Sequence, residues 1–252
     1  MCVVQDRDIS VVILAECDLN RNELATALSA NRLHDFRYIR PSASRVMLFT
    51  SLAEEQIKPV YEDEGGHLSI HRLRVEGTDV LLGTVHLPDK RSFISYGSQA
   101  SFAQRVADDV RRQERTLGVD RAIIVGDFNM DPYEPGMIGA FGFHALMAKT
   151  EAERETRTVL GRAYPTYYNP MWGHFGDRVE GPTGTFYYHS SEPVAYFWHM
   201  YDQVIARGPM AKQLLDVTIL TGCSGYTFTS RNGRPGGPNG SDHLPLAFSL
   251  DL

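Results

Sequence analysis

The stretch RAIIVGDFNMD, residues 121–131, decides how the rest of the chain is interpreted. Its apolar part, 122–125, predicts a buried strand that breaks at a glycine. Asp127 and Asn129 follow two residues apart, so in an extended backbone they point to one side while Phe128 packs to the other. A carboxylate and an amide in one cleft suit a hydrated metal ion or the water that attacks a phosphate. An Asx-type turn explains the two residues equally well, so other parts of the chain must decide.

Composition is that of an ordinary globular protein. The chain has 252 residues, of which 42% are hydrophobic and 22% charged, enough to bury a large core. No apolar run approaches the roughly 18 to 20 residues of a membrane span, and the first residues are too polar for a signal peptide. A net charge of −6 gives no general attraction for polyanions. We expect one domain over residues 1–252, with long duplex DNA disfavoured as a partner; the oligomeric state stays open.

The cysteines favour a reducing compartment. Cys2, Cys17 and Cys223 are few, odd in number and form no CxxC pair. They suggest neither a disulfide framework nor a thiolate zinc site. We therefore expect a cytoplasmic protein.

Other predicted strand ends carry titratable side chains. Residues 8–16 form a run rich in β-branched residues that finishes on Glu16, and the strand expected at 79–87 ends near His86. Asp202 stands just before an apolar strand, and Asp242 with His243 opens the last strand. Taken singly, such residues are more often exposed acids or structural histidines.

Two helices are expected from their spacing. Asn20 and Glu23 have the spacing of a capping box, which predicts a helix through Asn31. Apolar residues at positions 102, 106, 110 and 117 predict a helix over 98–117 that covers a sheet.

Aromatic residues concentrate between residues 164 and 201, where both tryptophans fall. Such rings either stack on bases and frame a ligand or form the core and strand pairs of a β-rich segment, which we expect for most of them. Four residues in a loop bounded by proline and glycine are expected at the rim of a substrate pocket: Tyr167, Tyr168, Asn169 and Trp172.

The order and spacing of these motifs resemble the endonuclease/exonuclease/phosphatase superfamily over nearly the full chain. The most specific motif is GDFN at 126–129, followed by SDHLP at 241–245; Glu16, the His-Leu pair at 86–87 and YDQV at 201–204 support it. The resemblance implies the deoxyribonuclease I-like fold, an α/β (α+β) two-sheet β-sandwich flanked by helices. Its site would lie where strand ends of both sheets converge.

The resemblance also implies a metal site and a water-activating pair. Glu16 would be the main ligand of Mg²⁺ or Mn²⁺, hard cations that prefer carboxylate and water oxygens, and Asp242 would join it directly or through water. Asp127 would orient or deprotonate the attacking water. Asn129 would hold that water or a phosphate oxygen.

Two histidines would contact the phosphoryl group in this scheme. His243, oriented by Asp202 through its other ring nitrogen, would donate a hydrogen bond or a proton as negative charge builds. His86 matches the position of a second phosphate-contacting histidine in the deoxyribonuclease and sphingomyelinase-like branches. The implied reaction is metal-assisted hydrolysis of a phosphoester.

The N-terminus departs from the family pattern. Members usually begin with a strand that ends in an asparagine, often after tryptophan, upstream of the metal-binding glutamate. Only fifteen residues precede Glu16, and they contain nothing like Trp-Asn. We expect the fold without this first strand, which would leave neighbouring strands unpaired. A misassigned or truncated start is favoured over a strand that the protein has dispensed with.

Three functions stay open. The first is a metal-dependent nuclease or phosphodiesterase, the second a phosphatase of a small or lipid phosphate, and the third a non-catalytic binding protein. The many converging polar groups argue against the third. The acidic net charge and aromatic loop favour a small substrate, a nucleotide or single-stranded nucleic acid. The loops at 164–200 and 221–239 have no motif that names the substrate.

Overall fold

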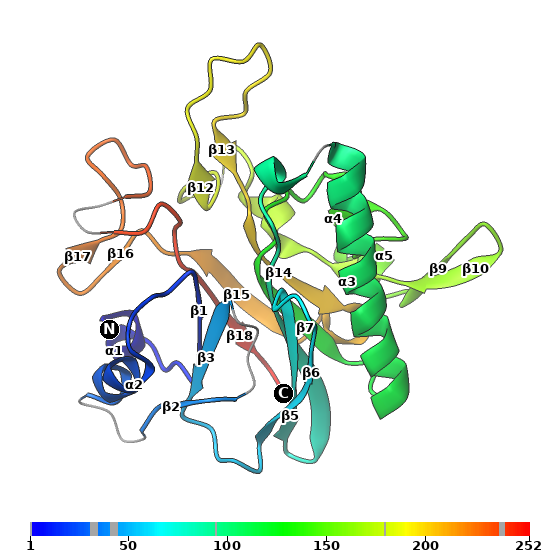
Figure 1. The fold of residues 1–252 in the computed structure, drawn as a ribbon, viewed down its shortest axis with the longest axis horizontal. Helices are drawn as coiled ribbons and strands as arrows, with labels where there is room; N and C mark the ends of the chain where they lie inside the picture. Colours follow the sequence, from blue (N-terminus) through cyan, green and yellow to red (C-terminus); the bar gives the residue numbers. More distant parts are fainter. Residues whose placement is uncertain (1, 31–34, 41–44, 94, 179, 237–239) are drawn as a thin grey trace.

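The computed structural model describes residues 2–30, 35–40, 45–93, 95–178, 180–236 and 240–252. The described residues form successive layers: helix α3 (Tyr96–Leu117), a seven-stranded sheet, a second layer of strands, and helices α1 (Cys2–Asp6) and α2 (Arg21–Ser29) (Figure 1). Three apolar clusters lie between these layers. The layers bring strand ends from two sheets to one side of the molecule.

The large sheet contains the strand that the apolar run at 122–125 predicts. Its order is β4-β5-β6-β7-β14-β11-β8. The bounds are β4 (Ile57–Glu62), β5 (Leu68–Val75), β6 (Thr78–His86), β7 (Ala122–Asp127), β14 (Asp202–Arg207), β11 (Tyr167–Tyr168) and β8 (Ala145–Leu146). β6 and β7 run parallel and α3 connects them, whereas β14 runs antiparallel to β7. The middle of the sheet is therefore β6, β7 and β14, and their ends carry the polar residues of the motifs.

The second layer consists of two separate groups of strands. One has the order β1-β3-β2, and the other pairs β15 with β18. The bounds are β1 (Val11–Ala15), β2 (Arg37–Tyr38), β3 (Val46–Thr50), β15 (Leu214–Ile219) and β18 (Leu246–Leu250). Leu48 of β3 and Leu214 of β15 share an apolar cluster with Ile123 and Val204 of the large sheet. The two layers are thus held face to face by apolar packing.

Strands β1 and β18 each have one unpaired edge within the described residues. β1 pairs only with β3, and β18 pairs only with β15. β1 is apolar at all five positions, yet four of its residues are half-buried and Ala15 is exposed. Within the described residues, one edge of each of these two strands therefore offers unpaired backbone groups.

The helices cover the outer faces of the two layers. In α3, Val106 and Val110 are buried against the large sheet, and Gly118 ends the helix in the left-handed conformation at φ 63°. In α2, Leu24 and Leu28 pack against the second layer. The expected cap is confirmed, because the Asn20 side chain accepts hydrogen bonds from two backbone N–H groups. The expected helix end at Asn31 lies outside the described residues. Across those residues no helix combines the length and hydropathy that crossing a bilayer requires.

Short elements make up the rest of the described chain. The helical ones are α4 (Pro135–Ile138), α5 (Lys149–Ala152), η1 (Lys90–Ser92), η2 (Pro170–His174) and η3 (Gly208–Met210). The short strands pair as β9 (Thr156–Val159) with β10 (Arg162–Pro165), β12 (Phe186–Tyr187) with β13 (Trp198–His199), and β16 (Gly222–Cys223) with β17 (Tyr226–Thr227). The β12–β13 and β9–β10 hairpins project from the body (Figure 1).

A disulfide corrects the interpretation of the cysteines. Cys2 of α1 is bonded to Cys223 of β16, with the two Cα atoms 5.7 Å apart, while Cys17 is free. The expectation of no disulfide was wrong because the partners are separated by 221 residues, so no local spacing marks them.

Candidate active site

Strand pairing places three of the expected residues in one row. His86 is the cross-strand partner of Asp127, and Asp127 is the partner of Asp202. These residues stand at neighbouring ends of β6, β7 and β14. Directly paired residues on adjacent strands present their side chains to the same face, so the row faces one space.

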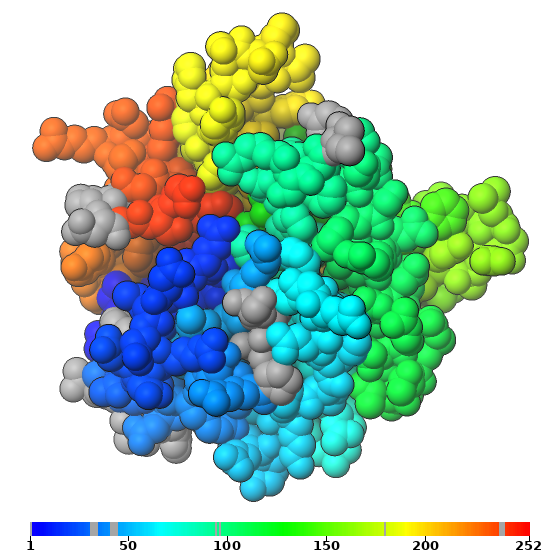
Figure 2. All heavy atoms as spheres, viewed as in Figure 1, coloured from blue at the N-terminus to red at the C-terminus, as the bar shows by residue number. Residues whose placement is uncertain are grey.

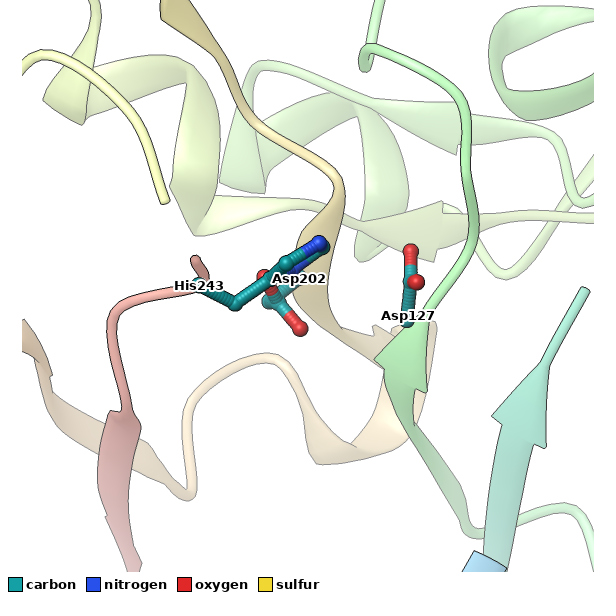
Figure 3. A group of neighbouring side chains, drawn as sticks. All are labelled: Asp127, Asp202 and His243. Carbon is teal, nitrogen blue, oxygen red and sulfur yellow. The ribbon is translucent and has the colours of Figure 1, made fainter. Parts of the chain in front are cut away.

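His243 joins this row from the loop that leads into β18. Its Nδ1 is 2.7 Å from Oδ2 of Asp202, which confirms the predicted pairing of the two residues. Ligand atoms of Asp127, Asp202 and His243 all lie within 4.8 Å of one another (Figure 3). Two carboxylates and one imidazole, from three different segments, therefore form an acidic and histidine group that is able to hold a metal ion.

The turn after β7 fixes the Asp127 carboxylate. Gly126 has φ 144°, and a Cβ added there would lie 1.9 Å from the carbonyl oxygen of Val85, so only glycine fits. The backbone N–H of Asn129, at φ 51°, donates to Oδ1 of Asp127 over 2.8 Å. This bond is an Asx turn, so the turn interpretation of these residues is confirmed, and their assignment to a site stays a prediction.

The Asn129 amide is largely committed to protein partners. Its Nδ2 donates to Oδ2 of Asp127 over 3.0 Å and to the carbonyl oxygen of Leu87 over 2.8 Å. Both amide hydrogens are thereby used, and Oδ1 is the atom left for a ligand. Phe128 points the other way into the core, as expected.

Glu16 reaches the same place from the second layer. It follows β1 at φ 48°, its side chain is 78% exposed, and its Oε1 lies 3.3 Å from Nε2 of His86. The same nitrogen is 3.6 Å from Oδ2 of Asp127. Strand ends of both layers therefore meet here, as the resemblance implied. In the space-filling view, the blue N-terminal, red C-terminal and yellow segments surround a hollow with green atoms at its base (Figure 2).

Asp242 lies at the edge of this group. Its side chain is exposed, and it is not one of the three residues whose ligand atoms cluster. Its negative charge nevertheless acts on His243, whose pKa it helps to raise. Its assignment as a metal ligand stays a prediction.

Burial and neighbouring charges shift the pKa values of Asp127, His243 and His86 in different ways. Burial, and then the charge of Asp202, raises the pKa of Asp127 to about 7. Burial opposes the charged form of His243, but the hydrogen bond and charge of Asp202 outweigh it and raise its pKa to about 9. Burial lowers the pKa of His86, with the charge of Glu16 opposing the shift. Near neutral pH His243 is thus a proton donor, and Asp127 is poised to accept a proton.

Two of the four residues expected at a pocket rim lie inside the protein. Tyr167 is 2% exposed and its hydroxyl donates to Glu114 over 2.7 Å. Asn169 is fully buried, and its Nδ2 donates to Oε1 of Gln203. Both placements differ from the expectation, because the short strand β11 is an inner strand of the large sheet. Tyr168 is half-buried, and so is Trp172, whose ring contacts Tyr133 and Phe175.

Two polar pairs close to the site escaped the sequence analysis. Nδ1 of His199 is 2.8 Å from Oδ2 of Asp131. Nζ of Lys90 is 2.6 Å from Oε1 of Glu134 and lies over the ring of Tyr201. The available signal was spacing: Asp131 continues the alternation of 127 and 129, and His199 closely precedes Asp202.

Known proteins are similar to this chain in structure, whereas its sequence finds no match. No family model and no curated protein matches the sequence. Sphingomyelinase C from Streptomyces griseocarneus is similar, with a TM-score of 0.58 and 14% identity over 96% of this chain and 86% of that one. An AP endonuclease from Archaeoglobus fulgidus has a TM-score of 0.55 and 14% identity, over 99% and 92% of the two chains. D. rerio TDP2 complexed with single strand DNA product has a TM-score of 0.54 and 15% identity, over 97% and 87%. These likenesses confirm the fold that the motifs predicted.

Proposed function

We propose that this chain, which has the deoxyribonuclease I-like fold of the endonuclease/exonuclease/phosphatase superfamily, is a divalent-metal-dependent phosphoester hydrolase and most of all a phosphodiesterase or nuclease. One observation carries the proposal: Asp127, Asp202 and His243 meet within 4.8 Å, where strand ends of two layers converge. A carboxylate of raised pKa beside a carboxylate-oriented imidazole suits proton transfer to and from a hydrolytic water and a phosphoryl oxygen.

The donor set fits a hard divalent cation. Glu16, Asp127 and Asp202 bring carboxylate oxygens to one place, which Mg²⁺ or Mn²⁺ prefers over sulfur or nitrogen ligands. The raised pKa of Asp127 reflects burial next to another carboxylate, an imbalance that a cation would relieve. Glu16 would hold the ion, with Asp242 as a further ligand. When bound, it would neutralise negative charge on the phosphoryl group.

Asp127 is proposed to orient the attacking water and accept its proton. A pKa of about 7 lies close to neutral pH, where a general base works best. Asn129 holds both carboxylate oxygens of Asp127 through its own N–H groups, so it fixes the direction of the base. Its free Oδ1 could also hold the water.

His243 is proposed to donate to the phosphoryl group or the leaving oxygen. Asp202 occupies its Nδ1, which leaves Nε2–H as the donor, and the raised pKa keeps the ring protonated at neutral pH. His86, held beside Glu16 and Asp127, is proposed as a second contact of the phosphate. Its pKa is lowered by burial, which favours the neutral ring.

The proposed substrate is a nucleotide or a single strand of nucleic acid. A similar structure is a complex with single strand DNA product, and the likeness supports a single-stranded substrate here. The cytoplasmic location stays a prediction, and the Cys2–Cys223 bridge weighs against it because disulfides are rare in reducing compartments.

The test is hydrolysis of bis(p-nitrophenyl) phosphate, a single-stranded oligonucleotide and p-nitrophenyl phosphate by the purified protein. We expect diester hydrolysis in Mg²⁺ or Mn²⁺ that stops with EDTA and falls at least about 100-fold in Asp127→Ala. Asp120→Ala, at the exposed surface just before β7, is the matched control and should keep the activity. Unchanged hydrolysis in EDTA or in Asp127→Ala would refute the proposed mechanism. Hydrolysis of the monoester alone would identify a phosphatase instead.

A different measurement distinguishes the proposed enzyme from a non-catalytic binding protein. The proposal expects calorimetric Mg²⁺ binding that is weakened in Glu16→Ala. Mg²⁺ binding that is absent, or that is unchanged in Glu16→Ala, together with no hydrolysis of the three compounds, would favour a non-catalytic binding protein.

A further inference from the structure

A second histidine and aspartate pair stands next to the proposed active site. Nδ1 of His199 lies 2.8 Å from Oδ2 of Asp131, a carboxylate that is 1% exposed. Oδ1 of Asp131 accepts the backbone N–H of Met200 over 2.7 Å, and Oδ2 also accepts the hydroxyl of Tyr133 over 3.1 Å. The proposed hydrolysis uses neither His199 nor Asp131. These donors compensate the burial of the Asp131 carboxylate and hold it in place. The fixed carboxylate in turn orients the imidazole of His199, as Asp202 orients that of His243.

The two imidazoles lie on either side of one aromatic residue. Phe186 is the cross-strand partner of His199 in the β12–β13 pair and also bridges to His243. Its ring centroid is 4.8 Å from that of His243 and 6.4 Å from that of His199. Partners in a ladder share a face, so both histidines are presented to the same side. Two strand spacings, roughly 10 Å, separate their backbones.

The free atom of His199 is Nε2. Because Asp131 already accepts from an N–H and an O–H, it acts as an acceptor, and Nδ1 of His199 is the donor in their bond. Nε2 has no hydrogen-bond partner among the described residues, and the side chain is 14% exposed. Tyr201 stacks on the ring at 4.9 Å, and Nζ of Lys90 lies 5.2 Å from the centroid of Tyr201. The surroundings therefore combine an oriented imidazole with an ammonium group that is itself paired with Glu134.

We propose that Nε2 of His199 binds a second phosphate of the substrate, adjacent to the phosphoester that His243 contacts. The inference rests on the proposed function, because it takes the substrate to be a phosphoester at His243. A carboxylate-paired imidazole binds an anionic oxygen through a charge-assisted hydrogen bond, and the spacing of the two histidines suits two groups of one molecule. Polynucleotides and small molecules with two phosphates share this chemistry.

The test compares pairs of diesters that differ by one phosphate. The nucleotide pair is thymidine 5′-(p-nitrophenyl phosphate) with and without a 3′-phosphate, and the other pair is glycerophosphoinositol with and without a 4-phosphate. The readout is the ratio of kcat/KM for the two members of each pair. A ratio above one in the nucleotide pair alone identifies a nucleic-acid substrate, and in the inositol pair alone a lipid-derived one.

The expected result is a preference of about tenfold for the doubly phosphorylated member of one pair, the size of one charge-assisted hydrogen bond. His199→Gln should bring that ratio close to one. His189→Gln, an exposed histidine on the same hairpin, should leave it unchanged. A purely structural pairing of His199 with Asp131 would alter stability but not the ratio. A ratio that is near one in the parent protein, or equal in His199→Gln, would overturn the inference.

A binding measurement separates this inference from the proposed function. Calorimetry would compare thymidine 3′,5′-bisphosphate with thymidine 5′-monophosphate as ligands of the parent protein and of His199→Gln. Tighter binding of the bisphosphate that is lost in His199→Gln would support the second phosphate site even in a protein that hydrolyses nothing. If each protein bound the bisphosphate and the monophosphate with equal affinity, the inference would be overturned. The proposed diester hydrolysis would not be affected by that result.

Discussion

At the scale of single residues, Asp202 has a strong influence on the charge of its partner His243. Burial alone would lower the pKa of His243, but the hydrogen bond and charge of Asp202 raise it to about 9. The imidazole is therefore protonated at neutral pH and loses its proton as the pH rises through about 9. Asp127, whose pKa is raised to about 7, takes the opposite role of proton acceptor.

Asp202→Asn should shift the alkaline side of the pH–rate profile. The substitution removes the charge that keeps His243 protonated while the burial that opposes protonation stays. We expect the fall in kcat/KM, located near pH 9 in the parent protein, to move to lower pH. Measurement of kcat/KM against pH in both proteins tests this. An alkaline limb at the same pH in the two proteins would mean that another group sets it.

At this scale, the family resemblance predicted the pair whose two members both lie in recognised motifs, while a pair outside those motifs escaped. The pairing of His243 with Asp202 followed from two recognised motifs and is confirmed at 2.7 Å. The pairing of His199 with Asp131 spans 68 positions and lies in no motif, so only the structure reveals it. Tyr167 illustrates the opposite case, because an aromatic residue in a polar stretch carries no sign that a sheet will bury it.

Among the elements, β7 is the one that the site depends on most. Its residues Ala122 to Val125 are buried between α3 and the second layer, and its end bears Asp127. Gly126 allows the chain to pass against the carbonyl oxygen of Val85 in β6. The close approach keeps the ends of β6 and β7 level, with His86 paired to Asp127.

Gly126→Ala should therefore destabilise the fold as well as the site. The added Cβ would lie 1.9 Å from a backbone oxygen, and φ 144° is unfavourable for any residue with a side chain. We expect the free energy of unfolding to fall by about 3 kcal/mol or more in urea denaturation. Gly173→Ala, where nothing lies within 4 Å and the glycine is exposed, is the control and should change it little. Equal stability of the two variants would contradict the close approach of β7 to β6.

Long apolar or alternating runs predicted the main strands, but very short strands carry no such signal. β7, β6 and α3 lie where the pattern placed them. β11, β12 and β13 have two residues each, which is too short to show a period of two. Their pairing depends on the neighbours that the fold supplies, and β12 is the strand that brings Phe186 between the two histidines.

Over the whole molecule, the site exists because two layers meet. Glu16 comes from the second layer and His86 from the large sheet, and the cluster around Leu48 and Ile123 holds the layers together. The motif order predicted this convergence through the family resemblance. The disulfide between Cys2 and Cys223 was not predictable, since an odd number of distant cysteines indicates no pairing.

Thiol titration tests the disulfide directly. The denatured, unreduced protein should expose one thiol, that of Cys17, and reduction should raise the count to three. Cys17→Ser should expose none before reduction. Because the bridge constrains a long segment of the unfolded chain, reduction should also lower the free energy of unfolding by about 2 to 5 kcal/mol. Three reactive thiols before reduction would show that the bridge does not form in the purified protein.

The group formed by Asp127, Asp202 and His243 is proposed to hydrolyse phosphodiesters. The most direct measurement is the initial rate of bis(p-nitrophenyl) phosphate hydrolysis in Mg²⁺ by the parent protein, His243→Gln and His189→Gln. We expect hydrolysis by the parent protein, a loss of about 100-fold or more in His243→Gln, and an unchanged rate in His189→Gln, since loss of a donor to oxygens on which negative charge builds typically costs this much. Equal rates in all three proteins, or no hydrolysis by the parent protein, would contradict the account.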